Sequence, residues 1–554
     1  GASTPSPPLL APPPPTRVDP RVDPDSLQSR SQPAATMSAK FIGAIDQGTS
    51  STRFVIMNHE GSIVASDQIE INQFYPQPGY VEHDALDIWA KTQQVMTNAL
   101  AKASLTPSDL VGVGITNQRE TTVIWNKDTG EPYHHALVWN DGRTAELAAQ
   151  WCAKLGGQDV LRPVCGLPIA SYFSVLKMLW LFDNVPGLKE AAEAGDAIFG
   201  TIDSWLVWNL TRDISPGATP APIHITEPTN ACRTMLFNIS ELKWDDGQIE
   251  LFGIPKQMLP EVRTSSEVYG VCAPCTPLAG VKIAAILGDQ NAALFGQCCF
   301  QTGQLKSTYG TGCFMLMNVG TKPVPSNSGL LSTMGYHLKG QPAVYALEGA
   351  VQVSGSLIQW LRDQLDVLDD AKDSEALALS VEDNGGVYFV PAFAGLFAPH
   401  WREDARGVIC GLTAFNSKAH VVRAGLEASA FQAQELFEAM EADSGVKLSS
   451  INVDGGMTAN GLFMQFHADM ARVRINRPKY LETTAMGAAY CAGLAVGFWQ
   501  DMDELQAKWA VDASWEPKMD LATRNKQFGF WKKAVARSKG WLLDDGKEAG
   551  AAGG

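Results

Sequence analysis

Residues 41–57 read Phe41-Ile42-Gly43-Ala44-Ile45-Asp46-Gln47-Gly48-Thr49-Ser50-Ser51-Thr52-Arg53-Phe54-Val55-Ile56-Met57. Two apolar runs flank a polar tip that contains glycine, a pattern that predicts a strand, a tight turn and a second strand. Glycine lets the N–H groups of such a turn approach an anion closely, and the Thr and Ser hydroxyls add neutral donors. Asp46 supplies a hard oxygen that can hold Mg²⁺ or its bound waters. The segment is therefore a candidate phosphate-binding hairpin.

A second segment in the other half of the chain has the same layout. It reads Ser307-Thr308-Tyr309-Gly310-Thr311-Gly312-Cys313 and continues into the apolar run Phe314-Met315-Leu316-Met317. A single glycine turn between strands is usually only a turn, so either hairpin alone is weak evidence of function. Two hairpins of one design predict duplicated halves that hold a polyphosphate from both sides.

Length and charge narrow the class of protein. A chain of 554 residues exceeds what one core usually supports, so two domains are expected. The net charge of −16 provides no basic surface for nucleic acid or an anionic membrane. The longest apolar stretch, residues 485–499, is too short to span a bilayer, and its many Gly and Ala residues predict a buried helix that another backbone approaches closely. We therefore expect a large soluble enzyme without an integral membrane segment.

The two ends of the chain differ from the rest. Ten of the 32 prolines fall in the first 36 residues, which predicts a disordered or polyproline-like arm. Met37 could be an ordinary start site, and the arm could instead be a targeting remnant or a translated leader, so organelle targeting stays open beside a cytoplasmic location. We expect a disordered arm over residues 1–37, a first domain over 38–296, a second domain over 297–540 and a flexible tail over 541–554.

Between the ends, strand-like and helix-like segments alternate, which indicates α/β architecture. Strands are expected at residues 111–115, 121–125 and 283–287, and helices at residues 85–104 (with Asp84 as N-cap), 172–183, 356–365 and 421–443.

Polar clusters follow several of the expected strands, at residues 117–120, 139–141 and 288–290. Ligands of open α/β sheets bind at the carboxyl ends of strands. Arg119 beside Glu120, with the separate pair Asp289-Gln290, suits a small neutral polyhydroxyl ligand, because carboxylates accept from hydroxyls and the guanidinium donates to them. The alternative is a structural Arg–Glu pair, with Asp289 as a turn or cap residue.

Longer motifs resemble a known family. Residues Tyr172-Phe173-Ser174-Val175-Leu176-Lys177-Met178-Leu179-Trp180-Leu181-Phe182-Asp183-Asn184 match one signature of the FGGY carbohydrate kinases at every defined position. A second signature matches residues 407–412, 420–421 and 424–427, with a departure at Gly425. Within this family, residues 115–122, 308–318 and 454–456 resemble the members that phosphorylate glycerol, and the resemblance extends from Lys40 to Trp499.

The resemblance implies an α/β fold of two actin-like (ribonuclease H-like) domains with an interdomain cleft that closes on ATP and its acceptor. It implies that glycerol contacts Arg119, Glu120, Trp139, Tyr172, Asp289, Gln290 and Phe314. It implies that the nucleotide contacts Thr49, Ser50, Ser51, Arg53, Thr311, Gly355, Gln359, Gly456 and Asn460. Asp46 would act on Mg²⁺, Asp289 would be the base for the attacking hydroxyl, and Arg53 would offset charge on the γ-phosphate.

Two other functions remain open at this point. One is a related kinase for xylulose, gluconate or ribulose, although the side chains around Arg119-Glu120 suit a three-carbon triol. The other is an actin-like or chaperone-like ATPase without a small acceptor. The expected partners are glycerol and ATP, with neither nucleic acid nor membrane, and the chain could form a homodimer or a homotetramer.

Overall fold

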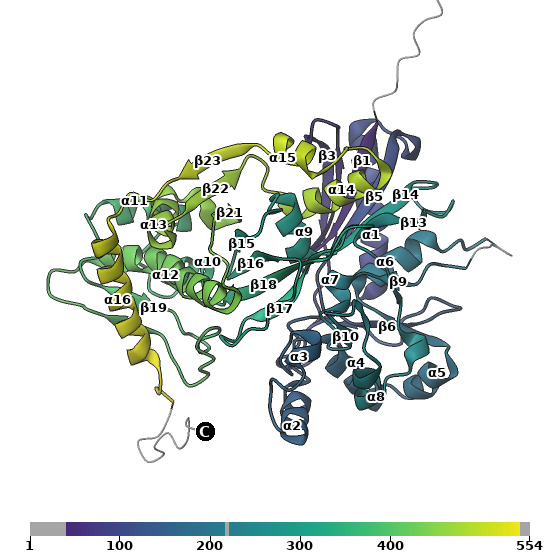
Figure 1. Cartoon of the computed structure of the whole chain (residues 1–554), viewed down its shortest axis with the longest axis horizontal. Coiled ribbons are helices and arrows are strands. Elements are labelled where there is room, and N and C mark those ends of the chain that lie inside the picture. The colour runs from purple at the N-terminus through teal and green to yellow at the C-terminus, as the bar shows by residue number, and fades with distance from the viewer. Residues whose placement is uncertain (1–39, 216–220, 543–554) are drawn as a thin grey trace, which may run out of the picture. The chain divides into compact units, whose positions relative to one another are not determined.

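The computed structural model describes residues 40–215 and 221–542, so the expected N-terminal arm and all but the first two residues of the expected tail lie outside the described part. The described part is mixed α/β and contains two large sheets (Figure 1). Its helices are α1 (Ala85–Ala103), α2 (Ala145–Leu155), α3 (Arg162–Cys165), α4 (Ser174–Asn184), α5 (Leu188–Ala194), α6 (Ile202–Thr211), α7 (Pro228–Ala231), α8 (Asp246–Phe252), α9 (Asp289–Gly296), α10 (Gly355–Asp363), α11 (Ser374–Leu379), α12 (Lys418–Ser444), α13 (Gly461–Ala471), α14 (Thr483–Val496), α15 (Met502–Lys508) and α16 (Leu521–Ser538).

The first sheet has six strands in the order β13-β14-β5-β1-β2-β3. Their bounds are β1 (Phe41–Gln47), β2 (Ser51–Met57), β3 (Ile63–Glu70), β5 (Leu110–Asn117), β13 (Ser266–Val271) and β14 (Lys282–Gly288). Strands β1, β2 and β3 form an antiparallel meander, β5 and β14 continue the sheet in parallel with β1, and β13 closes the edge antiparallel to β14. The hairpin expected from residues 41–57 is therefore the turn between β1 and β2.

The second sheet repeats this order. Its strands are β15 (Gln304–Tyr309), β16 (Cys313–Gly320), β17 (Leu331–Tyr336), β18 (Val344–Val351), β21 (Ser450–Asp454), β22 (Arg474–Pro478) and β23 (Val511–Trp515). Strands β18, β16 and β15 are antiparallel neighbours, β21 and β22 continue in parallel with β15, and β23 is antiparallel to β22. Strand for strand this is the pattern of the first sheet, with β17 added at one edge. The expectation of duplicated halves is confirmed.

Shorter strands pair outside the two sheets. They are β4 (Glu82–His83) with β7 (Ala136–Leu137), β6 (Val123–Asn126) with β8 (Ala197–Gly200), β9 (Ile225–Thr226) with β12 (Glu261–Val262), β10 (Phe237–Asn238) with β11 (Lys243–Trp244), and β19 (Tyr388–Val390) with β20 (Val408–Cys410).

Helices cover both faces of the first sheet. Helices α1 and α6 share one apolar core with it, while α14, from the far end of the sequence, packs against β5, β14, β1 and α9 (Figure 1). A side chain on Gly487 of α14 would lie 1.8 Å from the carbonyl oxygen of Ala292 in α9, so the two helix backbones are in direct contact. The prediction of a buried, closely approached helix at residues 485–499 is confirmed.

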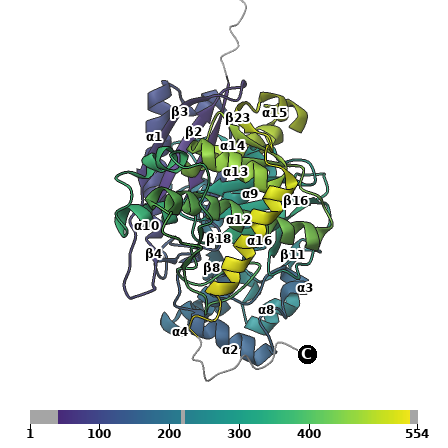
Figure 2. The same cartoon turned by 90° about the vertical axis from the view of Figure 1, so that its left-hand side faces the viewer.

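The second sheet packs against α12 and α13, and α16 packs against α13 and the β19–β20 pair; Figure 2 shows these three helices together on the side that faces the viewer. The four helices expected from periodicity are present as α1, α4, α10 and α12, with ends that differ from the expected ones by up to three residues. The Asp84 side chain accepts a hydrogen bond from the N–H of Leu86, which confirms the expected N-cap of α1.

The parallel strands bring two of the polar clusters together. Strand β5 ends at Asn117 and β14 ends at Gly288, and these two residues are paired neighbours in the sheet. Residues 118–120 and 289–290, which follow immediately, therefore leave the sheet at the same edge. Helix α9, which begins at Asp289, contacts both sheets, so this edge lies where the two halves meet.

Candidate active site

The first hairpin is held rigidly around its tip. The N–H of Gly48 donates to the carbonyl of Ser51 at 2.9 Å, and Gln73 Nε2 donates to the carbonyl of Thr49 at 2.8 Å. Arg53 pairs with Gln68 and with Glu482, the residue before α14. The Arg53 guanidinium is therefore engaged in this structure, and a phosphate contact would have to replace one of these partners.

Asp46, the next-to-last residue of β1, lies in a site that suits a divalent cation. Burial raises the pKa of Asp46 to about 6; Arg53 opposes this shift, and the neighbouring carboxylate of Asp289 adds to it. A buried carboxylate with a second carboxylate in its surroundings is stabilised by a hard cation with oxygen ligands, so the residues fit Mg²⁺. The described residues contain no group of three or more His, Cys, Asp or Glu that could hold a metal ion, so most other ligands would be water or phosphate oxygens.

The second hairpin borders a cavity. Its volume is about 590 Å³, and all five residues expected to contact the nucleotide from this half of the chain line it. The lining residues that were expected from the sequence are Thr311, Gly355, Gln359, Gly456 and Asn460. Other residues also line the cavity, and sequence patterns give no signal for several of them: Ala371, Lys372, Ser374, Glu375, Leu426 and Met457. No described contact joins this cavity to Thr49, Ser50 or Ser51, which lie on the first hairpin.

Glycines allow three segments to meet beside this cavity. The N–H of Gly355, at the start of α10, donates to the carbonyl of Gly310 at 3.0 Å, and a Cβ on Gly355 would lie 2.5 Å from that oxygen. Gly455 has φ +92°, and a Cβ there would lie 2.3 Å from the carbonyl oxygen of Tyr309. Larger side chains at Gly355 or Gly455 would push these segments apart.

Arg119, Glu120 and Asp289 lie together at the shared edge of β5 and β14, and we call these three residues the acceptor cluster. Arg119 Nε lies 3.5 Å from an Asp289 carboxylate oxygen, and a Cβ on Gly288 would lie 2.5 Å from the Arg119 side chain, so glycine is needed there for Arg119 to pass. Glu120 has φ +62°, a backbone conformation that costs a non-glycine residue about 1–2 kcal/mol. Residues held in such a conformation often belong to a functional site. Glu120 is also buried, next to Arg119 in the sequence.

Aromatic rings from both halves flank this cluster. Trp139 meets the ring of Tyr172 at 5.6 Å and the ring of Phe314 at 6.5 Å, both edge to face. Trp139 Nε1–H also donates to the hydroxyl of Thr49 at 2.8 Å. One side chain therefore contacts both the wall of the acceptor cluster and the tip of the first hairpin.

Asp289 has the environment of a general base. Burial raises its pKa, while Arg119 and Lys306 act in the opposite direction. It begins α9, where the N–H of Gln290 donates to its carboxylate at 2.7 Å. A carboxylate whose proton affinity is increased is better suited to accept a proton from a hydroxyl.

Sequence patterns missed several residues of the site. Lys306, in β15, is fully buried and donates to Gln290 and to Thr308, the latter at 3.1 Å, so it fixes the side chain of a predicted acceptor residue. Burial lowers the pKa of Lys306, and nearby Asp454 and Asp289 counteract that shift. Arg233 and Glu348 were also missed, and both contact the acceptor cluster. A single charged residue inside an apolar strand has no periodic signal that could have revealed it.

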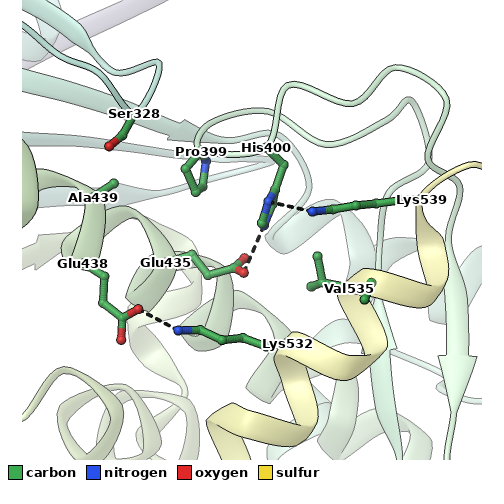
Figure 3. Close-up of a pocket in the computed structure, with 10 residues that line it drawn as sticks. Ser328, Pro399, His400, Glu435, Glu438, Ala439, Lys532, Val535 and Lys539 are labelled. Carbon is green, nitrogen blue, oxygen red and sulfur yellow. Dashed lines mark hydrogen bonds and ion pairs between the residues drawn. The ribbon is translucent and has the colours of Figure 1, made fainter. Parts of the chain in front are cut away.

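A second cavity lies along α12 and α16 (Figure 3), with a volume of about 410 Å³. His400 lies between Glu435, at 3.0 Å, and Lys539, at 3.1 Å, and Lys532 pairs with Glu438 at 2.9 Å. Because these charges already neutralise one another, the cavity offers little unmatched charge to a charged ligand.

The described residues include no helix with both the length and the apolar character needed to cross a membrane. Curated relatives match nearly the whole chain. The glycerol kinase of Methylobacterium radiotolerans is 55% identical over 507 residues, which cover 92% of this chain and 100% of the relative. The glycerol kinase of Brucella anthropi is 56% identical over 504 residues, which cover 91% of this chain and 99% of the relative.

Solved structures agree with this match. The crystal structure of Plasmodium falciparum glycerol kinase with ADP superimposes with a TM-score of 0.85 at 36% identity, covering 90% of this chain and 98% of that one. The xylulose kinase of Lactobacillus acidophilus superimposes with a TM-score of 0.79 at 22% identity, covering 90% and 99%, which shows a shared fold alone. The models of the N-terminal and C-terminal domains of the FGGY family match residues 41–296 and 305–496. This chain belongs to the FGGY family of carbohydrate kinases, with the actin-like, two-domain α/β fold of its relatives.

Proposed function

We propose that this chain is a glycerol kinase, which transfers the γ-phosphoryl group of ATP to glycerol and forms sn-glycerol 3-phosphate and ADP. The product would serve glycerol catabolism and glycerolipid synthesis. The observation that supports this most is the acceptor cluster: Arg119-Glu120 and Asp289 lie together between aromatic rings, and Trp139 connects them to the tip of a phosphate-binding hairpin. Relatives that share more than half of their residues with this chain over their full length carry the same name.

The acceptor cluster matches the chemistry of a triol. Arg119 donates to hydroxyl oxygens, while Glu120 and Asp289 accept from hydroxyl protons, so each hydroxyl finds both kinds of partner. The rings of Trp139 and Phe314 supply apolar surface for the carbon chain, and their close approach favours a short acceptor over a five-carbon or six-carbon sugar.

Asp289 acts as the general base. It accepts the proton of the attacking hydroxyl as the oxygen approaches the γ-phosphorus, and its raised pKa strengthens it for this task. Arg119, 3.5 Å away, keeps the carboxylate oriented between reaction cycles. A loose phosphoryl-transfer transition state needs this positioning and charge neutralisation more than it needs a covalent partner.

The two hairpins hold the polyphosphate. The N–H groups and hydroxyls of Thr49, Ser50 and Ser51 approach it from the first half, and Thr311 approaches it from the second. Arg53 exchanges its contact with Glu482 for the γ-phosphate. Mg²⁺, held by Asp46 directly or through water, would neutralise charge on the β- and γ-phosphates. Closure of the site would exclude water, which competes with glycerol as the acceptor.

A coupled assay of ADP release tests this function across glycerol, dihydroxyacetone, xylulose and gluconate. Glycerol should give the highest kcat/KM, and sn-glycerol 3-phosphate should appear in amounts equal to ADP when a stereospecific glycerol-3-phosphate dehydrogenase detects it. Purified chain that forms no glycerol 3-phosphate from MgATP would exclude the function. Preference for xylulose or gluconate would indicate a sugar kinase, and ATP hydrolysis that no polyol affects would indicate an actin-like ATPase.

A further inference from the structure

Four buried charges form one network at the acceptor cluster, and two of them, Arg119 and Glu120, belong to that cluster. Arg119, Glu120, Arg233 and Glu348 are each no more than 3% exposed. Glu348 accepts from Arg119 Nη1 at 2.7 Å and from Nη2 at 2.8 Å in a forked pair, and it lies 3.5 Å from Arg233 Nη2. Arg233 Nε donates to Glu120. We call these four residues the charge cluster.

The cluster joins segments that are far apart in the sequence. Arg119 and Glu120 follow β5 of the first sheet, Glu348 lies in β18 of the second sheet, and Arg233 follows the short helix α7. Residues of α7 also form hydrogen bonds to the ends of β5 and β14, from which the two polar clusters extend. Thr229 Oγ1 accepts from the N–H of Gly288 at 2.8 Å, and Asn230 Nδ2 donates to Asn117 at 3.1 Å.

The segment around α7 is itself buried and capped. In the structure Glu227 and Cys232 are buried inside the chain. Glu227 caps α7 by accepting from the N–H groups of Thr229 and Asn230, so it fixes the segment from which Arg233 extends.

Counting donors and acceptors shows what the charge cluster leaves for a ligand. Of the five N–H groups of Arg119, the one on Nε lies 3.5 Å from the Asp289 carboxylate, and both on Nη1 are used, by Glu348 and by Asn291 at 3.3 Å. Nη2 has one N–H beyond its bond to Glu348. Arg233 donates to one carboxylate oxygen of Glu120, which leaves the other oxygen for a hydroxyl. The partners of Arg119 and Glu120 thus determine which atoms of these two side chains remain free to bind a ligand.

Electrostatics argue against stability as the reason for the cluster. Burial alone would raise the pKa of Glu348, but Arg119 and Arg233 lower it to about 2, so the group stays charged. Replacing a buried ion pair by apolar residues of similar volume is often neutral or stabilising, so four such charges need another reason to be retained. Arg233 Nη1 has no hydrogen-bond partner within the described residues, although Arg233 is fully buried beside the Tyr172 ring, 5.4 Å away.

We propose that Glu348 and Arg233 are positioning residues of the acceptor site: Glu348 orients the Arg119 guanidinium from the second sheet, and Arg233 orients the Glu120 carboxylate. Neither residue needs to touch the reacting atoms. They set the direction of the one free Nη2 donor and the one free carboxylate oxygen. The inference rests on the proposed function, because it assigns the acceptor role to Arg119 and Glu120.

Glu348→Asp tests this while the buried charge is kept. The shorter side chain cannot form the forked pair without a shift of the guanidinium. A misplacement of about 1 Å lowers catalytic efficiency on the order of 10²-fold. We expect the KM for glycerol to rise by about 10²-fold, while the KM for ATP at saturating glycerol changes by less than about threefold. A merely structural role would lower stability and affect both constants together.

Glu267→Asp is the matched control. Glu267 is also buried and also pairs with two cations, Arg263 and Lys339, but it lies on β13 at the outer edge of the first sheet. The same loss of one methylene group there should leave both KM values within about twofold of the wild type. Thermal unfolding of both variants reports whether the fold is kept.

A second variant covers the case in which Glu348→Asp does not fold. The double variant Arg233→Met/Glu348→Gln removes one charge of each sign, so the buried charge stays balanced. It should bind ATP normally and lose glycerol affinity by at least the factor seen for Glu348→Asp. A wild-type KM for glycerol in either folded variant, or equal rises in both KM values, would overturn the positioning role. Wild-type enzyme that makes no glycerol 3-phosphate would instead overturn the proposed function.

Discussion

Replacing Gly487 by alanine tests the contact that holds α9, and with it Asp289, in place. The added Cβ would lie 1.8 Å from the carbonyl oxygen of Ala292 and 2.9 Å from the nitrogen of Gly296. Both are backbone atoms of α9 or its last turn, so no flexible side chain can move aside. Helices α9 and α14 must then separate by more than about 1 Å to reach a normal contact distance.

The expected loss of stability follows from two opposing effects. Alanine in place of glycine inside a helix gains about 1 kcal/mol through its higher helix propensity. Forcing extra volume into a packed contact costs about 1–3 kcal/mol, and more where the backbone must shift. Because α9 and α14 are both tied to the first sheet, we expect the cost to dominate and Gly487→Ala to lose about 2 kcal/mol or more. A shift of about 1 Å in Asp289 should also lower kcat by about 10²-fold.

Gly529→Ala is the control, because Gly529 lies inside α16 and an added Cβ there meets nothing within 4 Å. Only the gain in helix propensity remains, so this variant should be slightly more stable than the wild type and fully active. Chemical denaturation and coupled ADP release measure both properties. If alanine at 487 stabilised the protein as alanine at 529 does, the close crossing of α9 and α14 would be refuted.

Three further outcomes are expected. Asp289→Asn should lower kcat by about 10²–10⁴ with folding intact, as stopped-flow or steady-state ADP release would show; near-normal turnover would remove Asp289 from the role of base. The pKa of Asp46 is raised to about 6, so kcat/KM should fall as the pH drops through about 6 and the carboxylate that holds the cation is protonated. More Mg²⁺ should move that fall to lower pH, and a pH profile that ignores Mg²⁺ would contradict the metal assignment. Thr311→Ala should raise the KM for ATP more than the KM for glycerol; a drop in glycerol affinity alone would show that the nucleotide assignment is misplaced.

Local patterns predicted the parts of the fold that depend on local pairing. The two hairpins, α1 with its Asp84 cap and the strands β5 and β14 all follow from alternation, helical spacing and capping, which act between residues close in sequence. The polar residues Arg119 and Asp289 could be placed side by side, because parallel neighbouring strands end at one edge.

Other parts depend on contacts that no local pattern records. Helix α14 is apolar almost all round, so its sequence indicated burial but not which sheet it covers. Glu348 is a single charge among apolar neighbours in β18, so no periodic pattern indicates its role, and its partner Arg119, which follows a strand of the other sheet, pairs with it in the interior. Arg233 follows a four-residue helix whose sequence gives no signal for an ion pair. Ion pairs between residues far apart in the sequence determine where the Glu348 and Arg233 side chains lie.

The placement of α14 also bears on how the protein is made. Its Ala488 packs against Gly114 of β5, a strand that is synthesised about 370 residues earlier. The last strand of that sheet, β14, ends about 200 residues before Gly487, so at about 5–20 residues per second the complete apolar face waits roughly 10–40 s on the ribosome before its cover emerges. During this interval the nascent chain presents an uncovered Ile, Val and Ala surface, which is a target for chaperones and a risk for aggregation. The first half of the sequence is thus made first but completed last.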